Sequence, residues 1–351
     1  MIMQVITIYP DGENNVPQMN DSHVLHVYDC IHEDDLKRIL VRHGTPRYIV
    51  NDSFSFLQGN FSSPFYCVNL WLADQVKSFI GLESNDLYQT KHCANFIVNK
   101  KLAHRHLCIK MVELFGLDVA YTWNGIDPNF NLLPIFENLS RYGYAGCISE
   151  QEKHVLMQPI NLQPRWIDYE RQITSDFAVL NYGDKSLGDN VWTWKNGLDD
   201  IFQSSAVSII TESVDTQMGM HFSEKTLYSV LGLTFPIWVG GYKQAEEWRK
   251  FGFDTFDDII DHDYQHFQNF FERCWYAIKL NLNLITDLER LSEIRYKHRH
   301  RLLKNRDLIL NGQVEKYNYK IIQTWPSDLR DLLPTILENM TRKNLASLVQ
   351  R

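Results

Sequence analysis

Short apolar runs alternate with amphipathic segments along the first half of the chain. The runs have the length and the β-branched content of buried strands, and the segments between them carry apolar side chains at helical spacing. The predicted strands are 1–9, 23–28, 47–50, 94–98 and 118–123. The predicted helices are 33–42, 64–80 and 107–116. Because strands that alternate with helices build a parallel sheet covered by helices, the pattern predicts an α/β fold.

The same alternation returns after 141–174, a stretch in which the periodicity is weak. There 206–211 is an apolar, β-branched run, and 235–239 is a second one that ends at Gly240-Gly241. Between these two runs a polar loop leads to Ser223, which is placed to cap the helix that follows it. The order strand, loop, helix, strand therefore collects polar side chains at strand ends and at a helix start.

The first residues of that helix, Glu224-Lys225-Thr226, suit a ligand that carries a diphosphate between hydroxylated rings. Ligands of α/β sheets bind at the carboxyl ends of strands, where a helix N-terminus offers free N–H groups. A lysine in the first turn opposes the helix dipole, so an anion explains Lys225 better than helix stability does. A carboxylate accepts two hydrogen bonds in one plane, so Glu224 suits a pair of sugar hydroxyls. A capping box beside a solvated lysine is the alternative interpretation.

Several short motifs follow one another in a fixed order between Glu212 and Asp261. They are Glu212, Phe222-Ser223-Glu224-Lys225-Thr226, Phe235-Pro236-Ile237, Gly240-Gly241, Phe251-Gly252-Phe253-Asp254-Thr255-Phe256 and Ile259-Ile260-Asp261. This ordered set resembles the donor-binding half of GT-B-type glycosyltransferases, in particular the fucosyltransferase-like group of bacteria and large bacteriophages. In that group a Glu-Lys pair that opens a helix contacts the sugar nucleotide.

The resemblance implies a fold of two Rossmann-like domains facing a cleft, with a helical C-terminal region. It also implies a UDP- or GDP-sugar as co-substrate and no bound cofactor. Glu224 would lie near the ribose or the sugar, and Lys225 on the diphosphate. The expected donor-binding residues of this half are Glu212, Ser223, Glu224, Lys225, Thr226, Gly240 and Gly241.

Basic and imidazole side chains gather directly after the strand 94–98. Lys100, His104 and Arg105 fall at the exit of that strand and at the start of a helix, which favours an anionic or polar ligand. Members of the same glycosyltransferase group often carry an Asn-basic-basic…His-Arg string here, so the resemblance adds these three residues to the donor site. A solvated helix start, with Arg105 in a surface ion pair, is the alternative.

An inverting transfer needs a carboxylate or a histidine that takes the proton of the acceptor. In a two-domain architecture we expect this group at a strand end of the first domain, and Asp52 and Asp29 both end predicted strands. An aromatic loop suited to holding a sugar or a base follows Asp52, whereas a helix rich in acids follows Asp29, where a turn or capping role competes. Asp52 is therefore the preferred candidate base.

The pattern becomes helical after Asp261. The run 295–306 carries six Lys or Arg residues and two His without an acid. Lys297, Arg301 and Lys304 are predicted to fall on one helix face. One interpretation is a solvated charged face, and the other is a contact with the phosphates of a DNA acceptor.

Composition and charge limit the classes of partner. A chain of 351 residues is long enough for two cores, and a net charge of −8 argues against a protein that coats nucleic acid. The six cysteines form no C-x-x-C pair and indicate reduced thiols. Without a signal peptide or an apolar run long enough to span a membrane, we expect a cytoplasmic protein. Asp261-His262-Asp263 resembles the metal-binding D-x-D of other glycosyltransferases, but helix capping explains it more simply, so we expect no metal.

We therefore expect an acceptor-side α/β domain at 1–158, a nucleotide-sugar-binding domain at 159–325, and a terminal helix at 326–351 that could cross back to the first domain. The expected activity is transfer of a sugar from a nucleotide donor to a hydroxyl. The acceptor would be either a glycan or a hydroxylated DNA base, as in DNA modification by bacteriophages. The alternative is a nucleotide-sugar-binding or scaffold protein with a degenerate, non-catalytic site.

Overall fold

The computed structural model describes residues 3–8, 16–27, 33–51, 61–80, 89–98, 102–123, 132, 148–160, 194–212 and 222–339. It is an α/β protein with two four-stranded sheets, in which all neighbouring strands are parallel. The described chain divides into two compact units. The first unit contains the described residues up to Asp74 together with those from Val314 to Asn339, and the second contains the described residues between Gln75 and Gln313.

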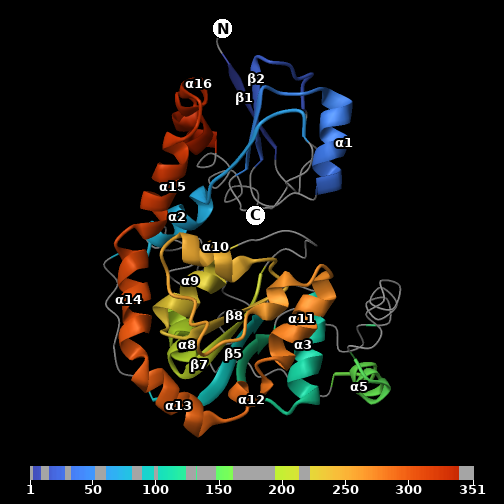
Figure 1. The fold of residues 1–351 in the computed structure, drawn as a ribbon, viewed down its shortest axis with the longest axis vertical. Helices are drawn as coiled ribbons and strands as arrows, with labels where there is room; N and C mark the ends of the chain where they lie inside the picture. The colour runs from blue at the N-terminus through green and yellow to red at the C-terminus, as the bar shows by residue number, and fades with distance from the viewer. Residues whose placement is uncertain are drawn as a thin grey trace. The chain divides into compact units, whose positions relative to one another are not determined.

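The strands of the first unit follow one another across its sheet in the order of the chain (Figure 1). They are β1 (Gln4–Ile8), β2 (His23–Val27), β3 (Tyr48–Asn51) and β4 (Phe65–Cys67). Helix α1 (Glu33–His43) connects β2 to β3. The sequence assigned β4 to a helix at 64–80. That helix, α2 (Leu70–Lys77), begins later, where the Asn69 side chain accepts a hydrogen bond from the backbone N–H of Leu72.

Successive side chains of a strand point to opposite faces of a sheet, and β2 and β3 supply a separate core to each face of the first sheet. One core contains Leu25 and Ile49, against which α1 packs through Leu36. The other core contains Val24 and Val50, and its remaining members come largely from the C-terminal segment of the chain. These members are Ile322, Trp325, Leu329 and Ile336.

The C-terminal segment of the first unit forms α15 (Gln313–Gln323) and α16 (Ser327–Arg330). The side-chain amide of Asn318 donates to the backbone oxygen of Asn69 at 2.8 Å and accepts from its backbone N–H at 3.1 Å. These buried hydrogen bonds, together with the apolar contacts, hold the last described residues against the first sheet. The segment 326–339 thus belongs to the same unit as β1 to β4.

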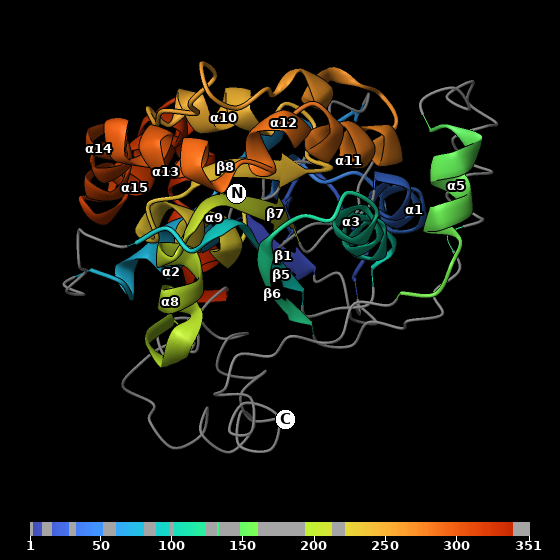
Figure 2. The same cartoon turned by 90° about the horizontal axis from the view of Figure 1, so that it is seen from below.

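The second unit contains the sheet β6-β5-β7-β8, whose strand order departs from the order of the chain. The strands are β5 (His92–Val98), β6 (Val119–Trp123), β7 (Ser205–Thr211) and β8 (Phe235–Val239). Helix α3 (Ala103–Leu114) leads from β5 to β6, and α9 (Glu224–Leu231) leads from β7 to β8. Figure 2 shows α3 and α11 on one side of this sheet and α8 and α9 on the other.

The chain leaves the two central strands of the second sheet in opposite directions. From β5 it passes through α3 to β6 at one edge, and from β7 it passes through α9 to β8 at the other edge. Neighbouring strands whose connections diverge in this way define a topological switch point, and ligands of open α/β sheets bind outside the carboxyl ends of such strands. In this unit the switch point lies beyond Val98 and Thr211.

The remaining elements of the second unit are mostly short helices. They are α5 (Glu150–Leu156), η1 (Trp194–Leu198), α8 (Asp199–Gln203), α10 (Gln244–Lys250), η2 (Asp263–His266), α11 (Phe270–Lys279), α12 (Leu282–Ile285), α13 (Leu288–Lys297) and α14 (Arg299–Leu310). Within the described residues no helix has the length and apolar content needed to cross a membrane. Among the described residues, Cys67, Cys93, Cys108 and Cys274 are reduced thiols outside any disulfide.

The division into units differs from the predicted boundary at 158–159. β5 pairs with β6 on one side and with β7 on the other, so strands assigned by sequence to two domains share one sheet. The first unit is smaller than expected and is completed by the C-terminal helices. The reason is that periodicity predicts each strand but carries no information about which strands pair. The described part of the weakly periodic stretch, 148–160, lies within the second unit.

Candidate functional site

Seven polar residues predicted from the sequence to bind the donor gather beyond β5 and β7, and we call them the switch-point cluster. His104 and Arg105 lie in the first turn of α3, which follows β5. Glu212 directly follows β7, and the remaining members begin α9. The cluster is His104, Arg105, Glu212, Ser223, Glu224, Lys225 and Thr226. Two helix N-termini thus meet the end of β7 at the switch point of the sheet.

The start of α9 is held by a side-chain cap, as the sequence predicted. Ser223 has extended backbone angles, and its hydroxyl accepts a hydrogen bond from the N–H of Lys225 at 3.3 Å. The backbone N–H of Ser223 in turn donates to the carboxylate of Glu212 at 3.2 Å. The first turn of this helix is therefore fixed relative to the end of β7.

Glu212 is the hub of the cluster, and its carboxylate is used within the protein. Oε1 accepts from the hydroxyl of Thr226 at 2.8 Å and from the side-chain amide of Gln244 at 3.4 Å. The Thr226 hydroxyl also accepts from the indole N–H of Trp238 at 2.9 Å. Glu212 and Thr226 are both buried. They therefore hold the end of β7 against the start of α9. The sequence predicted a direct contact between the Glu212 carboxylate and a donor, and such a contact would have to displace these hydrogen bonds.

His104 and Arg105 converge on the backbone oxygen of Glu212. Nε2 of His104 lies 3.1 Å from this oxygen and Nη2 of Arg105 lies 3.2 Å from it, while Nη2 also reaches the backbone oxygen of Thr211 at 3.2 Å. Helix α3 begins at Ala103, earlier than the predicted 107, so both side chains belong to a buried helical turn. The alternative of a solvated helix start with Arg105 in a surface ion pair is wrong.

Burial sets the protonation of these two side chains. Burial, followed by the charge of Arg105, lowers the pKa of His104 to about 3, so the imidazole is neutral at physiological pH. Burial also lowers the pKa of Arg105, although the nearby carboxylates of Glu224 and Glu212 act in the opposite direction. Arg105 remains charged, since an arginine does not lose its proton in proteins.

Lys225 is almost completely buried at the N-terminus of α9. Its ammonium group pairs with the Glu224 carboxylate at 2.6 Å, with 5% of the lysine side chain and 24% of the glutamate side chain exposed. The interpretation of Lys225 as a solvated cation therefore does not hold. Its charge lies in the same cluster as Arg105, where a neighbouring anion is favoured by both side chains and by the helix dipole.

Gly240 and Gly241, the last predicted members of the donor half, allow close packing after β8. Gly240 has φ +87°, and a Cβ atom there would lie 2.4 Å from the ring of Phe270. The ring of Phe270 also packs against His104, with centroids 5.4 Å apart. The guanidinium of Arg273 donates to the backbone oxygen of Gly240 at 2.8 Å. Sequence reasoning missed Arg273, whose signal was a cation between the aromatic pairs 270–271 and 275–276.

Three of the predicted site residues lie outside the described residues. They are the candidate bases Asp29 and Asp52, and Lys100 of the basic string. The other predicted donor residues all lie in the second unit, between the first turn of α3 and the start of α10.

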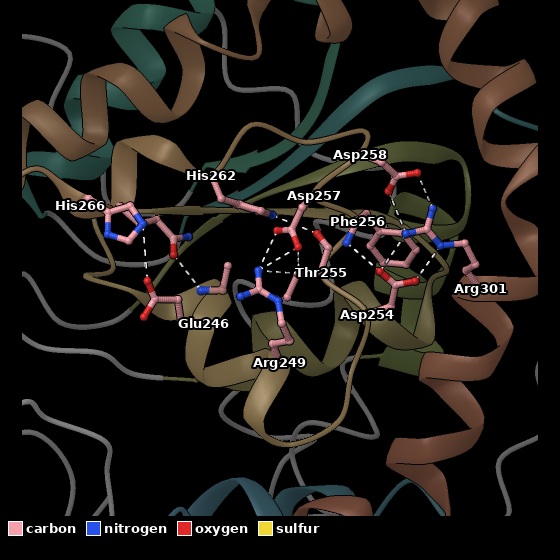
Figure 3. A network of polar contacts seen from close by, with 12 residues as sticks. Glu246, Arg249, Asp254, Thr255, Phe256, Asp257, Asp258, His262, His266 and Arg301 are labelled. Carbon is pink, nitrogen blue, oxygen red and sulfur yellow. Dashed lines mark hydrogen bonds and ion pairs between the residues drawn. The ribbon is translucent and has the colours of Figure 1, made fainter.

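The predicted basic run at 295–306 is divided between two helices. The chain breaks at His298 between α13 and α14, so Lys297 lies on a different helix from Arg301 and Lys304. Arg301 is bound by the carboxylates of Asp254 and Asp258 over 2.6 to 2.9 Å, as Figure 3 shows. Lys297 and Lys304 are exposed. The carboxylates of Asp254 and Asp258 already neutralise the Arg301 charge, which argues against the predicted phosphate contact of this residue.

The Asp261-His262-Asp263 motif forms a turn in the structure. The Asp261 carboxylate accepts from the backbone N–H of Asp263 at 2.9 Å, and the imidazole of His262 donates through Nε2 to the backbone oxygen of Thr255 at 3.0 Å. Among the described residues no group of three His, Cys, Asp or Glu side chains could hold a metal ion.

The switch-point cluster combines two buried cations, a neutral imidazole and the N-terminus of an eight-residue helix at the ligand-binding edge of a parallel sheet. This arrangement can bind a polyanion and hydrogen-bonding groups beside it.

Comparison with other proteins adds no independent identification. No protein-family model, curated protein or solved structure matches this chain.

Proposed function

We propose that this chain is a glycosyltransferase that takes a sugar from a nucleotide-sugar donor bound at the switch-point cluster and transfers it to a hydroxyl acceptor. In this proposal the second unit is the donor-binding domain of a GT-B-like enzyme. The position of the cluster at a switch point supports nucleotide binding. The order of the motifs between Glu212 and Asp261, which resembles the donor half of fucosyltransferase-like enzymes, supports the choice of a sugar nucleotide.

The observation that carries the proposal is the buried charge of Arg105. Its side chain is 1% exposed, and its hydrogen bonds go to the backbone oxygens of Thr211 and Glu212. Among the described residues the guanidinium forms no ion pair with a carboxylate, and the charges of Glu224 and Glu212 do not offset the effect of burial on its pKa. A buried cation without a close counter-ion is unfavourable, and an anionic ligand would remove this cost. Arg105 therefore predicts a bound anion at the switch point.

A nucleoside diphosphate fits the groups around Arg105. The diphosphate would lie between Arg105, Lys225 and the N-terminus of α9, so that protein groups supply the positive charge. Glu224, which is partly exposed, would then exchange its contact with Lys225 for hydroxyl groups of the donor. Asp52, and after it Asp29, remain the candidate bases for an inverting transfer.

The test is a titration of the purified protein with uridine and guanosine diphosphates and their hexose derivatives, followed by an assay of donor hydrolysis and sugar transfer. Arg105→Met should weaken the best ligand at least about tenfold, because a charge-assisted hydrogen bond is lost. Arg295→Met is the matched control. Arg295 is also a buried arginine, and it donates to the backbone oxygens of Leu233, Gln203 and Gly232 away from the cluster.

Each result of this titration bears on one part of the proposal. If no nucleotide of the panel binds the parent protein, or if Arg105→Met binds as tightly as the parent, the cluster is not a donor site. Equal losses in Arg105→Met and Arg295→Met would mean that both act through folding alone. Tight binding without hydrolysis or transfer to any offered hydroxyl would support the alternative of a nucleotide-sugar-binding protein with a degenerate site.

A further inference from the structure

Two neighbouring side chains of the switch-point cluster each keep one buried polar atom without a partner. His104 is 0% exposed and Arg105 is 1% exposed, and within the described residues neither Nδ1 of His104 nor Nε of Arg105 has a hydrogen-bond partner. Buried polar atoms in native proteins are nearly always bonded, so each exception needs an explanation. Two exceptions on adjacent residues of one site suggest a common missing partner.

The backbone contact of His104 determines what its free atom can do. A carbonyl oxygen only accepts hydrogen bonds, so Nε2, which faces the oxygen of Glu212 at 3.1 Å, must carry the hydrogen. Because burial and Arg105 keep the ring neutral, Nδ1 then carries a lone pair and no hydrogen. Nδ1 of His104 can therefore only accept a hydrogen bond.

Nε of Arg105 has the opposite property, since every nitrogen of a guanidinium is a donor. Both side chains contact the same backbone oxygen. Nδ1 of His104 is two covalent bonds from Nε2, and Nε of Arg105 is two covalent bonds from Nη2, while Nε2 and Nη2 both contact the backbone oxygen of Glu212. An acceptor and a donor thus belong to adjacent residues that share one backbone contact, and the ring of Phe270 packs against His104.

The two atoms distinguish between classes of ligand group. An ionised phosphate or carboxylate could accept from Arg105 but has no hydrogen to give to His104. An ammonium or amide N–H could donate to His104 but would leave Arg105 without an acceptor. A hydroxyl group satisfies both, because its hydrogen bonds one side chain while a lone pair accepts from the other.

We propose that His104 and Arg105 form a subsite for a hydroxyl group of the ligand, with Nδ1 of His104 accepting from the hydroxyl and Nε of Arg105 donating to it. This inference rests on the proposed function. It adds that the cluster selects a hydroxylated ligand over a bare anion. The hydroxyl belongs either to the ribose or to the transferred sugar, both of which flank a diphosphate in a nucleotide sugar.

The test uses His104→Gln, with pyrophosphate, uridine diphosphate, its 2′- and 3′-deoxy forms and UDP-glucose as probes, and the guanosine series in parallel. The terminal amide nitrogen of a glutamine can take the place of Nε2 and keep the bond to Glu212, but nothing replaces Nδ1. The variant should keep the affinity for pyrophosphate within about twofold and lose about three- to tenfold for the hydroxylated ligand, the worth of one neutral hydrogen bond. His106→Gln, a change at an equally buried histidine of α3, is the control and should alter no ratio.

The two sources of the hydroxyl give different patterns. A ribose hydroxyl predicts that the parent protein discriminates against one deoxy nucleotide and that His104→Gln abolishes this discrimination. A sugar hydroxyl predicts instead that the gain in affinity from uridine diphosphate to UDP-glucose shrinks in the variant. Discrimination by the parent is measured without any variant, so the inference remains open to refutation even if His104→Gln does not fold.

Three results would overturn the inference. Equal losses for pyrophosphate and for the hydroxylated probes would mean that His104 only positions Arg105. Unchanged affinities for every probe, together with no discrimination by the parent, would mean that water occupies the subsite. If the parent protein binds pyrophosphate but binds each hydroxylated probe no more tightly than its deoxy form, there is an anion site without the hydroxyl subsite. If the parent protein binds none of the probes, the proposed function is wrong as well.

Discussion

Arg301 holds Asp254 in a two-pronged ion pair, with Nε 2.6 Å from Oδ2 and Nη2 2.9 Å from Oδ1. The same guanidinium donates to both carboxylate oxygens of Asp258 and lies over the ring of Phe256. Asn305, one helical turn further along α14, bonds both backbone groups of Asp254. The basic run of α14 therefore fastens this helix to the turn 254–258 of the second unit (Figure 3).

This relationship predicts that Arg301→Met lowers the free energy of unfolding by about 1–2 kcal/mol, since two carboxylates lose a charge-assisted partner at a partly exposed position. Lys304→Met is the control, because Lys304 is exposed on the same helix, and its replacement should change stability by less than about 0.5 kcal/mol. Urea unfolding followed by circular dichroism measures both. Equal stability of Arg301→Met and the parent would show that the ion pairs contribute nothing net.

The same contacts predict a dependence on pH. Burial raises the pKa of Asp254, but the hydrogen bonds from Arg301 and from the backbone N–H of Phe256, together with the Arg301 charge, hold it below its usual value. The hydrogen bond from Arg301 also lowers the pKa of Asp258. A carboxylate with a depressed pKa in the folded state stabilises the fold above its unfolded pKa of about 4, and this contribution is lost as the pH falls through the folded pKa. Between about pH 5 and pH 3 the parent should therefore lose stability more steeply than Arg301→Met. Parallel slopes would argue against the assignment.

The local features of the donor half could be predicted from the sequence, and those that depend on distant contacts could not. The strand 235–239 and the cap at Ser223 are as predicted, because both follow from the pattern of a few neighbouring residues. The pairing of β5 with β7 joins segments separated by about a hundred residues, and no periodicity encodes it. The C-terminal helices that complete the first unit were only a possibility for the same reason.

The same distinction between local features and distant contacts applies to the individual site residues. The sequence predicted a common site for His104, Arg105, Glu212 and Lys225 because each follows a strand or begins a helix. The structure does place these residues in one cluster. Their partners, however, depend on tertiary contacts. The sequence predicted a ligand contact for Glu212, but its carboxylate bonds to the start of α9. It predicted a phosphate contact for Arg301, but this side chain bonds to Asp254.

The position of Glu212 makes a prediction that separates support of the fold from ligand contact. Glu212→Gln keeps the size of the side chain but replaces one carboxylate oxygen by an amide nitrogen, which cannot accept a hydrogen bond. Either the N–H of Ser223 or the hydroxyl of Thr226 then loses its acceptor. Stability should therefore fall by about 1–3 kcal/mol. The affinity for uridine diphosphate should stay the same or rise, since a negative charge near Arg105 is removed. A selective loss of nucleotide affinity at unchanged stability would instead mean that Glu212 contacts the donor.

The ion pair between Lys225 and Glu224 predicts opposite effects of removing its two members. Lys225 is buried with Glu224 as its close counter-ion, so a bound diphosphate must compete with that carboxylate. Lys225→Met should weaken pyrophosphate and uridine diphosphate by about tenfold or more, because a charge-assisted contact is lost. Glu224→Gln should strengthen pyrophosphate binding, because it removes the competitor and leaves the cation.

Nucleotide sugars then distinguish the second role of Glu224. If its carboxylate moves from Lys225 to hydroxyls of the donor, Glu224→Gln gains affinity for pyrophosphate and loses the additional affinity that UDP-glucose has over uridine diphosphate. Thermal unfolding of both variants serves as the control. Lys225→Met should change it little, since Glu224 is partly exposed and can be hydrated, whereas Glu224→Gln leaves the buried Lys225 without its close counter-ion and should lower the unfolding temperature. Changes of the same sign in both variants would show that the pair acts as a structural unit at the start of α9, and the diphosphate would then have to bind through Arg105 alone.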